Sequence, residues 1–237
     1  MCILEADHLS PEAATRYGGY GEMFKSLFAG VSGSITCDVF NVVDGEYPVS
    51  TAYDAWLITG SKADAFSDEA WIVQLRKYVI ERYESGHKLL GVCFGHQILA
   101  SALGGKTERA SAGWGIGIQS FDVVEKRPWM QPGLRKLSLL MSHRDQVSVL
   151  PPGAATFASS SYCPNAGYVI DDQVIGVQGH PEFDTDFSRL IYAKRKENCS
   201  RDHYAESMQS LELPHDGLVV AQWFVNFVER RPVPINK

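Results

Sequence analysis

The feature that most constrains the fold is a cysteine that sits between a short apolar segment and a helix-like segment, with glycine two positions away on each side. This stretch reads Gly91-Val92-Cys93-Phe94-Gly95-His96-Gln97. A nucleophile on a sharp strand-to-helix turn is exposed at the carboxyl edge of a sheet, and the flanking glycines leave room for a strained backbone and for a substrate. A structural cysteine flanked by glycines is the alternative. The stretch therefore predicts an α/β protein with a nucleophile elbow at Cys93.

The segments around this elbow alternate between short apolar strands and longer amphipathic helices. In the first half, strands are expected at residues 3–6, 35–43, 55–59 and 88–92, and helices at 21–28, 68–84 and 95–103. This alternation of strands and helices predicts a three-layer α/β fold with a mostly parallel central sheet and helices on both faces. The second half predicts a more antiparallel set of strands at 115–124, 137–141, 155–159, 168–170 and 174–178, followed by helices at 184–196 and 218–229.

Composition narrows the class of protein. Hydrophobic residues make up 45% of the 237 residues, which is enough for a substantial core, and the net charge of −6 disfavours nucleic acid as the main partner. The five cysteines are scattered and include no C-x-x-C pair, which excludes a zinc ribbon and indicates a reducing compartment. We expect a cytoplasmic location, no membrane contact, no metal and no organic cofactor, because the sequence has no secretory leader, no long apolar span and no histidine spacing suited to a metal.

A second motif supplies partners for the cysteine. The apolar segment 174–178 runs directly into Gly179-His180-Pro181-Glu182-Phe183. Side chains two apart on an extended segment leave the same face, so His180 and Glu182 can point together. Pro181 restrains His180 to an extended conformation. A base held by a third group is what an activated nucleophile requires, so the two motifs together predict a site at Cys93.

The pattern G-x-C-x-G-x-Q followed far downstream by H-P-E resembles the class I (triad) glutamine amidotransferases. The resemblance is to the GMP-synthase-like glutaminase branch, as a free-standing protein, and it spans roughly residues 3–190. It implies a flavodoxin-like α/β domain over residues 1–190. We expect residues 191–237 to form a C-terminal helical extension packed on the same domain, and the sequence assigns this extension no role.

The resemblance implies a catalytic triad of Cys93, His180 and Glu182. Cys93 would attack the side-chain amide carbon of a glutamine-like substrate, and His180 would pass the thiol proton to the departing ammonia or amine. Water would then hydrolyse the γ-glutamyl thioester.

The resemblance also implies an oxyanion hole made of backbone N–H groups, one from Phe94 and one from Gly60 or Ser61. In the family this loop is usually rich in glycine with a proline close behind, whereas here it reads Gly60-Ser61-Lys62-Ala63. The hole uses backbone donors, so the substitution need not abolish it, and whether the loop is already formed at rest stays open at this stage.

Three residues are expected on the substrate side. Gln97 would help to seat the substrate. The segment Met141-Ser142-His143-Arg144-Asp145-Gln146-Val147 is similar to the S-H-x-D-x-V stretch that borders the substrate pocket in the GMP-synthase-like branch. His143 and Asp145 are therefore candidates for substrate contact. The alternative for His143 is a hydrogen-bonded structural histidine.

Several functions stay open at this stage. A glutaminase would need a separate ammonia-accepting synthase subunit, whereas a γ-glutamyl peptidase or hydrolase acting on small γ-glutamyl compounds would need no partner. A non-catalytic regulatory protein that binds glutamine is disfavoured by the intact triad. Redox or chaperone-like proteins with a cysteine elbow lack the His-Pro-Glu segment.

Overall fold

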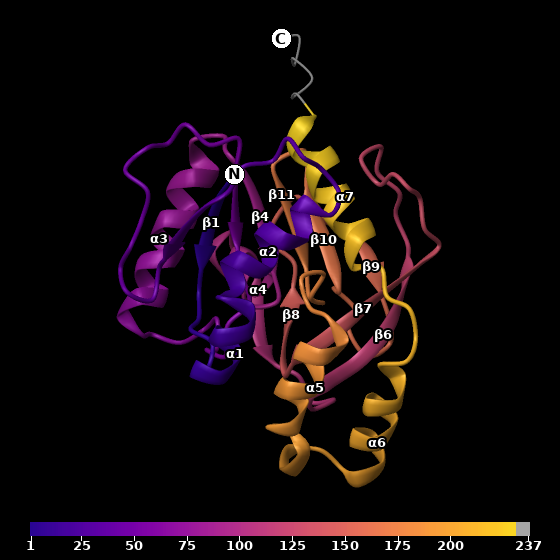
Figure 1. Cartoon of the computed structure of the whole chain (residues 1–237). Helices are drawn as coiled ribbons and strands as arrows, with labels where there is room; N and C mark the ends of the chain where they lie inside the picture. Colours follow the sequence, from indigo (N-terminus) through magenta and orange to yellow (C-terminus); the bar gives the residue numbers. More distant parts are fainter. Residues whose placement is uncertain (231–237) are drawn as a thin grey trace.

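The computed structural model describes residues 1–230, and its centre is a nine-stranded mixed sheet with helices on both faces (Figure 1). The strands are β1 (Cys2–Glu5), β2 (Asp38–Asn41), β3 (Ala55–Ile58), β4 (Lys88–Val92), β5 (Lys106–Arg109), β6 (Gly115–Val123), β7 (Lys136–His143), β8 (Asp145–Val149), β9 (Ala154–Ser159), β10 (Gly167–Ile170) and β11 (Val174–Val177). The helices are α1 (Pro11–Tyr17), α2 (Tyr20–Ala29), α3 (Ala70–Glu84), α4 (Phe94–Ala102), α5 (Thr185–Ala193), the 3-10 helix η1 (Lys196–Asn198), α6 (Arg201–Ser210) and α7 (Gly217–Glu229).

The main sheet has a parallel half and an antiparallel half. Its order is β2-β1-β3-β4-β11-β10-β9-β6-β7, and the strands from β2 to β11 are parallel, whereas every pairing from β11 to β7 is antiparallel. Strand β11 lies between β4 and β10, so the segment that precedes His180 is hydrogen-bonded beside the segment that precedes Cys93. This arrangement confirms the predicted α/β class, its parallel first half and its more antiparallel second half.

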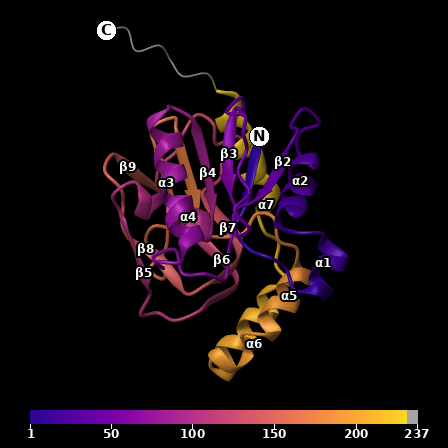
Figure 2. The same cartoon turned by 90° about the vertical axis from the view of Figure 1, so that its left-hand side faces the viewer.

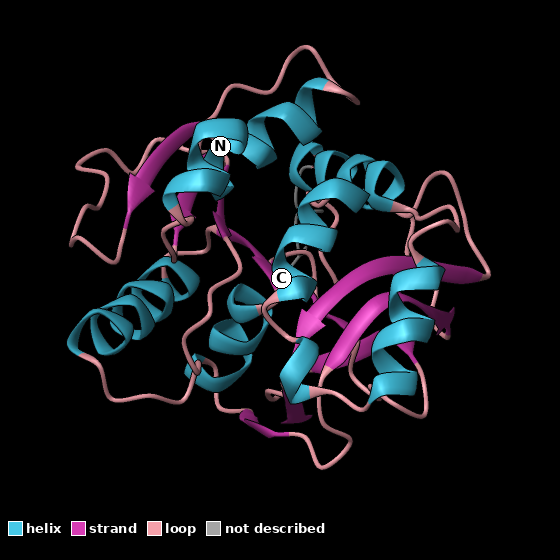
Figure 3. Ribbon diagram, turned by 60° about the horizontal axis from the view of Figure 1, so that its bottom comes forward, coloured by secondary structure: helices cyan, strands magenta, loops and turns pink. Residues whose placement is uncertain are grey.

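The buried strands have apolar side chains on both faces because each face is covered by helices. Leu57, Leu90 and Ile175 are in register on neighbouring strands and belong to the core cluster that includes α2 and α7. Their neighbours one position earlier point to the opposite face and pack in the cluster that includes α3 and α4. Figure 3 shows helices on both sides of the strands. This two-sided burial holds the carboxyl ends of the central strands in a fixed place.

After the last strand of the sheet, the chain up to residue 230 forms three α-helices and a short 3-10 helix. Helices α5 and α6 lie beyond the carboxyl edge of the parallel strands (Figure 2), and α6 packs against β6, where the Ser210 hydroxyl accepts a hydrogen bond from the Ile118 N–H. Helix α7 returns to the sheet and buries its aromatic side chains Trp223, Phe224 and Phe227 in the core. The Lys88 ammonium at the start of β4 donates hydrogen bonds to the carbonyl oxygens of Phe227 and Val228, which ties the last turn of α7 to the strand that leads to Cys93. The last seven residues of the predicted extension 191–237 lie outside the described residues.

Five elements have no separate counterpart in the predicted strands and helices, namely α1, β5, β8, η1 and α6. Helix α1 is short and buries only Ala13. Strands β5 and β8 form a separate two-stranded antiparallel sheet, and in β5 only Thr107 is buried. Helix α1 and strand β5 each bury a single side chain, so neither shows the periodic apolar pattern that predicts a helix or a strand. None of the helices within residues 1–230 combines the length and the apolar character needed to cross a bilayer.

Candidate active site

Cys93 occupies the turn between β4 and α4 in a strained conformation. Its φ of 51° places it in the left-handed region, where a residue with a side chain is uncommon. The Cys93 N–H donates to the Val177 carbonyl at 2.9 Å, so the last residue of β11 helps to hold this turn. Such strain is stored at functional sites when the surrounding structure enforces it. The elbow predicted from the sequence is therefore present.

Two glycines allow this turn to form. A Cβ on Gly95 would lie 2.1 Å from the carbonyl oxygen of Ile58, and a Cβ on Gly91 would lie 2.5 Å from the carbonyl group of Gly95. Both distances are far inside van der Waals contact. The first turn of α4 thus packs directly on the backbone of β3 and β4, which fixes the position of Cys93 by close packing.

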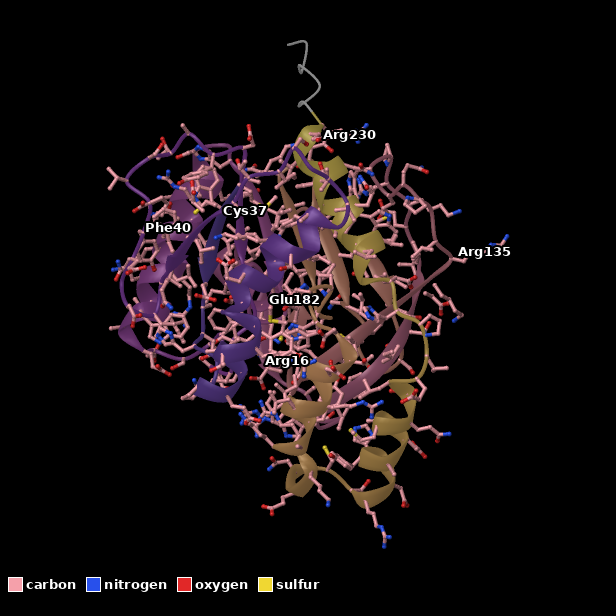
Figure 4. All side chains as sticks on the ribbon, viewed as in Figure 1. Arg16, Cys37, Phe40, Arg135, Glu182 and Arg230 are labelled. Atoms are coloured by element: carbon pink, nitrogen blue, oxygen red, sulfur yellow. The ribbon has the colours of Figure 1, made fainter. Side chains whose placement is uncertain are left out.

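His180 is held in one orientation by groups on three sides. Its Nδ1 lies 2.8 Å from the Glu182 Oε1, and its ring stacks on Phe183 with 3.8 Å between centroids and 7° between planes. A Cβ on Gly60 would lie 2.8 Å from the His180 Cε1 and 3.7 Å from the Cys93 Cβ. The imidazole is therefore packed between Phe183 and the backbone at Gly60, next to Cys93. The Glu182 side chain is fully buried, and Figure 4 shows it near the middle of the molecule.

The charge environment favours the protonated form of this imidazole. Burial lowers the pKa of His180, but the Glu182 carboxylate and the Cys93 sulfur outweigh burial and raise the pKa to about 10. The His180 Nε2 is buried and has no hydrogen-bond partner among residues 1–230. One ring nitrogen is thus committed to the carboxylate, and the other is available for proton transfer.

The backbone N–H groups of Gly60, Ser61 and Phe94 donate to no acceptor within the described part of the chain. Phe94 is the first residue of α4, where an N–H has no partner inside the helix and the helix dipole favours negative charge. These three amides are the ones predicted to form the oxyanion hole. Because these N–H groups have no acceptor in the described residues, they can donate hydrogen bonds to an oxyanion.

A small cavity of about 50 Å³ adjoins Cys93, and all three predicted substrate-side residues line it. The Gln97 Nε2 donates to the Asp145 carbonyl at 2.6 Å and to the Gln178 Oε1 at 3.1 Å, so this amide nitrogen braces the site internally. Burial lowers the pKa of His143 to about 3, which keeps the ring neutral. Its Nδ1 is buried without a partner among residues 1–230.

The acidic side of the same cavity is organised by Arg109. Its Nε donates to the Asp145 Oδ1 at 3.0 Å, and its terminal nitrogen lies 2.8 Å from the Asp64 Oδ2. Burial raises the pKa of Asp145, whereas the Arg109 hydrogen bond opposes that rise. The Arg109 guanidinium therefore bridges the two carboxyl groups at this end of the cavity.

The cavity also has cationic and aromatic lining residues to which the sequence assigned no role in the site. Trp114, Arg144 and Arg195 line it together with Cys93. Arg144 lies inside a motif that was recognised, but it received no role, and Arg195 comes from the segment that the sequence left unassigned. No three His, Cys, Asp or Glu side chains within residues 1–230 are arranged to hold a metal ion.

Comparisons with known proteins identify the family and the fold. The sequence profile described as glutamine amidotransferase class-I matches residues 41–192. The chain is 34% identical to "Gamma-glutamyl peptidase 5" of Arabidopsis thaliana over 211 aligned residues. This alignment covers 83% of this chain and 82% of the relative. It is also 34% identical over 117 residues to the glutamine-hydrolysing GMP synthase subunit of Methanoculleus marisnigri, covering 48% of this chain and 63% of the relative. A crystal structure of a glutamine amidotransferase from Thermotoga maritima has the same fold, with a TM-score of 0.78 and 19% identity over 97% of this chain and 99% of that one.

Proposed function

This chain belongs to the class-I glutamine amidotransferase family, and from that premise we propose that it hydrolyses γ-glutamyl amides with Cys93 as nucleophile. One observation carries the proposal: the His180 ring is clamped between Glu182, Phe183 and Gly60 beside a cysteine held at positive φ. A nucleophile, a base and an orienting carboxylate within one buried corner suit acyl transfer.

In the first step, the Cys93 sulfur attacks the carbonyl carbon of the γ-amide. His180 holds the thiol proton and gives it to the leaving nitrogen when the C–N bond breaks, which releases ammonia or an amine and leaves a γ-glutamyl thioester. Glu182 keeps the ring in the orientation and tautomer that this transfer needs, because it accepts the Nδ1 hydrogen.

In the second step, His180 takes a proton from water as the water attacks the thioester. Glutamate departs and the Cys93 thiol is restored. Both tetrahedral intermediates carry an oxyanion, which we assign to the free N–H of Phe94 and an N–H at Gly60 or Ser61. Removing one such donor commonly costs about 10²–10³ in rate.

The favoured substrates are small γ-glutamyl compounds that the chain can hydrolyse without a partner. The Arabidopsis relative that is 34% identical to this chain is named a gamma-glutamyl peptidase, and the alignment covers more than four-fifths of both proteins. A cytoplasmic location fits this chemistry because the cysteines are unpaired and the nucleophile must stay reduced.

A second candidate is glutaminase action that supplies ammonia to a synthase subunit. It is favoured by the similarity to the glutamine-hydrolysing GMP synthase subunit, which covers about half of this chain. In that case the chain alone would turn over glutamine slowly, and a separate synthase would accept the ammonia.

The test compares Cys93→Ala with Cys163→Ala. Cys163 is also buried, and burial raises the pKa of its thiol to about 12, so it is a matched control with an inert sulfur. We expect Cys93→Ala to lower kcat/KM on γ-glutamyl dipeptides by about 10⁵-fold or more, as loss of a nucleophile does in comparable triads. Cys163→Ala should stay near wild type. Inactivation by Cys163→Ala with an active Cys93→Ala would overturn the assignment.

The same purified protein separates the two candidates. Turnover of γ-glutamyl dipeptides that far exceeds turnover of glutamine favours the peptidase. The reverse preference, or activity that requires an added synthase, favours the glutaminase. Mass spectrometry of the quenched wild-type enzyme should reveal a γ-glutamyl adduct on the peptide that contains Cys93, which tests the thioester directly.

A further inference from the structure

Two guanidinium groups lie over one indole ring in the cavity beside Cys93. The Arg195 Cζ is 4.1 Å from the centroid of the Trp114 ring, and the Arg144 Cζ is 5.4 Å from the same ring. Cation–π contacts of this kind attract the cation to the ring face and restrict the guanidinium plane. We call Trp114, Arg144 and Arg195 the cationic wall.

The cationic wall has no counter-charge of its own. Within residues 1–230, no carboxylate lies within ion-pair distance of Arg144 or Arg195, and the Nε atoms of both are buried without a hydrogen-bond partner. Burial and the nearby Arg144 lower the pKa of Arg195, while nearby Tyr20 and Cys93 oppose this. Partly buried charges without partners are costly, and a bound carboxylate would relieve that cost with charge-assisted hydrogen bonds.

Arg195 stands where two cavities meet. It lines the small cavity that contains Cys93, and it also lines a larger cavity of about 400 Å³. Lys62 is the other cation shared by both cavities, but its ammonium lies 2.8 Å from the Asp7 carboxylate and is neutralised there. Within the described part of the chain, Arg195 is therefore the free cation at this junction.

The larger cavity is suited to an apolar group that carries a negative end. Its lining includes five apolar side chains, Leu9, Ala13, Phe187, Leu190 and Ile191. Glutamine ends at its amide nitrogen and needs no such room. A γ-glutamyl amino acid continues beyond that nitrogen by a whole residue that ends in a carboxylate.

On the basis of the proposed function, we propose that Arg195, supported by Trp114 and Arg144, binds the carboxylate of the leaving group. The larger cavity then receives the side chain of the amino acid that leaves. The preferred substrates are γ-glutamyl amino acids or peptides that have an apolar residue after the γ-linkage and a free carboxylate close to it.

The experiment uses three substrates that differ in their carboxylates. γ-Glutamyl-leucine carries the glutamyl α-carboxylate and a leaving-group carboxylate, whereas γ-glutamyl-leucinamide and glutamine carry only the first. We measure kcat/KM for the wild type, Arg195→Gln, Arg195→Lys and Lys196→Gln. Lys196 is exposed, lies next to Arg195 in sequence and lines neither cavity, so it is the matched control.

We expect the wild type to prefer γ-glutamyl-leucine over the leucinamide by about tenfold to a hundredfold, which is the range for a hydrogen bond to a charged group. Arg195→Gln should bring this ratio close to one, Arg195→Lys should restore part of it, and Lys196→Gln should keep it. The change should fall mainly on KM, and the melting temperature of each variant should stay near that of the wild type.

Two results would overturn the inference and leave the proposed function standing. One is Cys93-dependent hydrolysis by the wild type with no preference between the dipeptide and its amide. The other is an equal loss on all three substrates in Arg195→Gln, which would place the glutamyl α-carboxylate at this residue. Absence of any Cys93-dependent hydrolysis of the three compounds would instead refute the proposed function itself.

Discussion

Two parts of the site are built by different physical means. One is the corner, formed by Cys93, His180, Glu182 and the glycines packed around them, and the other is the cationic wall, which lines the same cavity as Cys93. In the corner, Gly91 and Gly95 let backbone segments approach closely and Gly60 lets the His180 ring approach, so that a Cβ at any of the three would collide with a neighbour. In the wall, long side chains from distant segments stack on one indole without counter-charges from the described residues. The corner fixes geometry, whereas the wall supplies charge. A change in the corner should therefore affect every γ-glutamyl substrate alike, and a change in the wall should affect only those with the matching anion.

The largest effect that sharpens this comparison is expected from Glu182→Gln. The amide keeps the size of the side chain but no longer stabilises the imidazolium, and it can favour the wrong tautomer. We expect kcat to fall by about 10³–10⁴-fold on all substrates alike, as in other triads that lose the orienting carboxylate. Glu84→Gln, an exposed change at the end of α3, is the control.

The pH dependence of the same variant gives a second readout. The pKa of His180 is raised to about 10, so the protonated ring should persist through neutral pH and activity should decline only as pH approaches about 10. By the same linkage, the protonated ring contributes stability that is full below the ordinary histidine pKa of about 6.5 and is lost as pH rises toward about 10. In Glu182→Gln both declines should move to lower pH. An unchanged alkaline limb would show that Glu182 does not set the charge of His180.

The next effect is expected from Gly60→Ala. The added Cβ would lie 2.8 Å from the His180 Cε1, so the ring or the loop must shift. We expect kcat to fall by about 10²-fold on peptide and amide substrates alike, because small displacements of a catalytic group have costs of this size. Gly33→Ala is the matched control, since a Cβ there meets nothing within 4 Å. A loss confined to one substrate would contradict the proposed division between corner and wall.

The smallest effect is expected from Trp114→Leu in the cationic wall. Loss of the ring removes the cation–π contacts of Arg144 and Arg195, and the contact with Arg195, at about 0.5–1 kcal/mol, corresponds to about twofold to fivefold in kcat/KM. The loss should appear with γ-glutamyl-leucine and be absent with its leucinamide, which serves as the internal control. An equal decrease on both substrates would show that Trp114 supports the corner instead of the wall.

Sequence alone predicted the corner well and the wall poorly, and the physical reason lies in how each is encoded. The corner rests on local signals, a glycine-flanked cysteine after a buried strand and a His-Pro-Glu run after another, and parallel strands bring such ends to one edge. The two-stranded sheet was missed because Lys106–Arg109 is polar and buries only Thr107. Helix α1 was missed despite Ser10 and Pro11, a common start signal, because it has almost no apolar face.

The wall could not be read from local pattern. Trp114, Arg144 and Arg195 come from three separate segments, and Arg195 follows α5 in a charged stretch that reads as an ordinary solvated surface. Only the fold places that surface over the cavity. A signal was available at Arg144, which occupies the variable position of the S-H-x-D stretch, but one arginine gives no hint of its partners.

The place of β11 in the sheet has a consequence for how this enzyme is made. Its hydrogen bonds to β4 fix the Cys93 turn, yet β11 leaves the ribosome long after β4 does. A nascent or truncated chain that stops before residue 174 lacks both His180 and the strand whose Val177 carbonyl accepts the Cys93 N–H. The pairing of β11 with β4 therefore makes the Cys93 turn and the His180 position late features of folding, which form only after residues 174–182 have been synthesised.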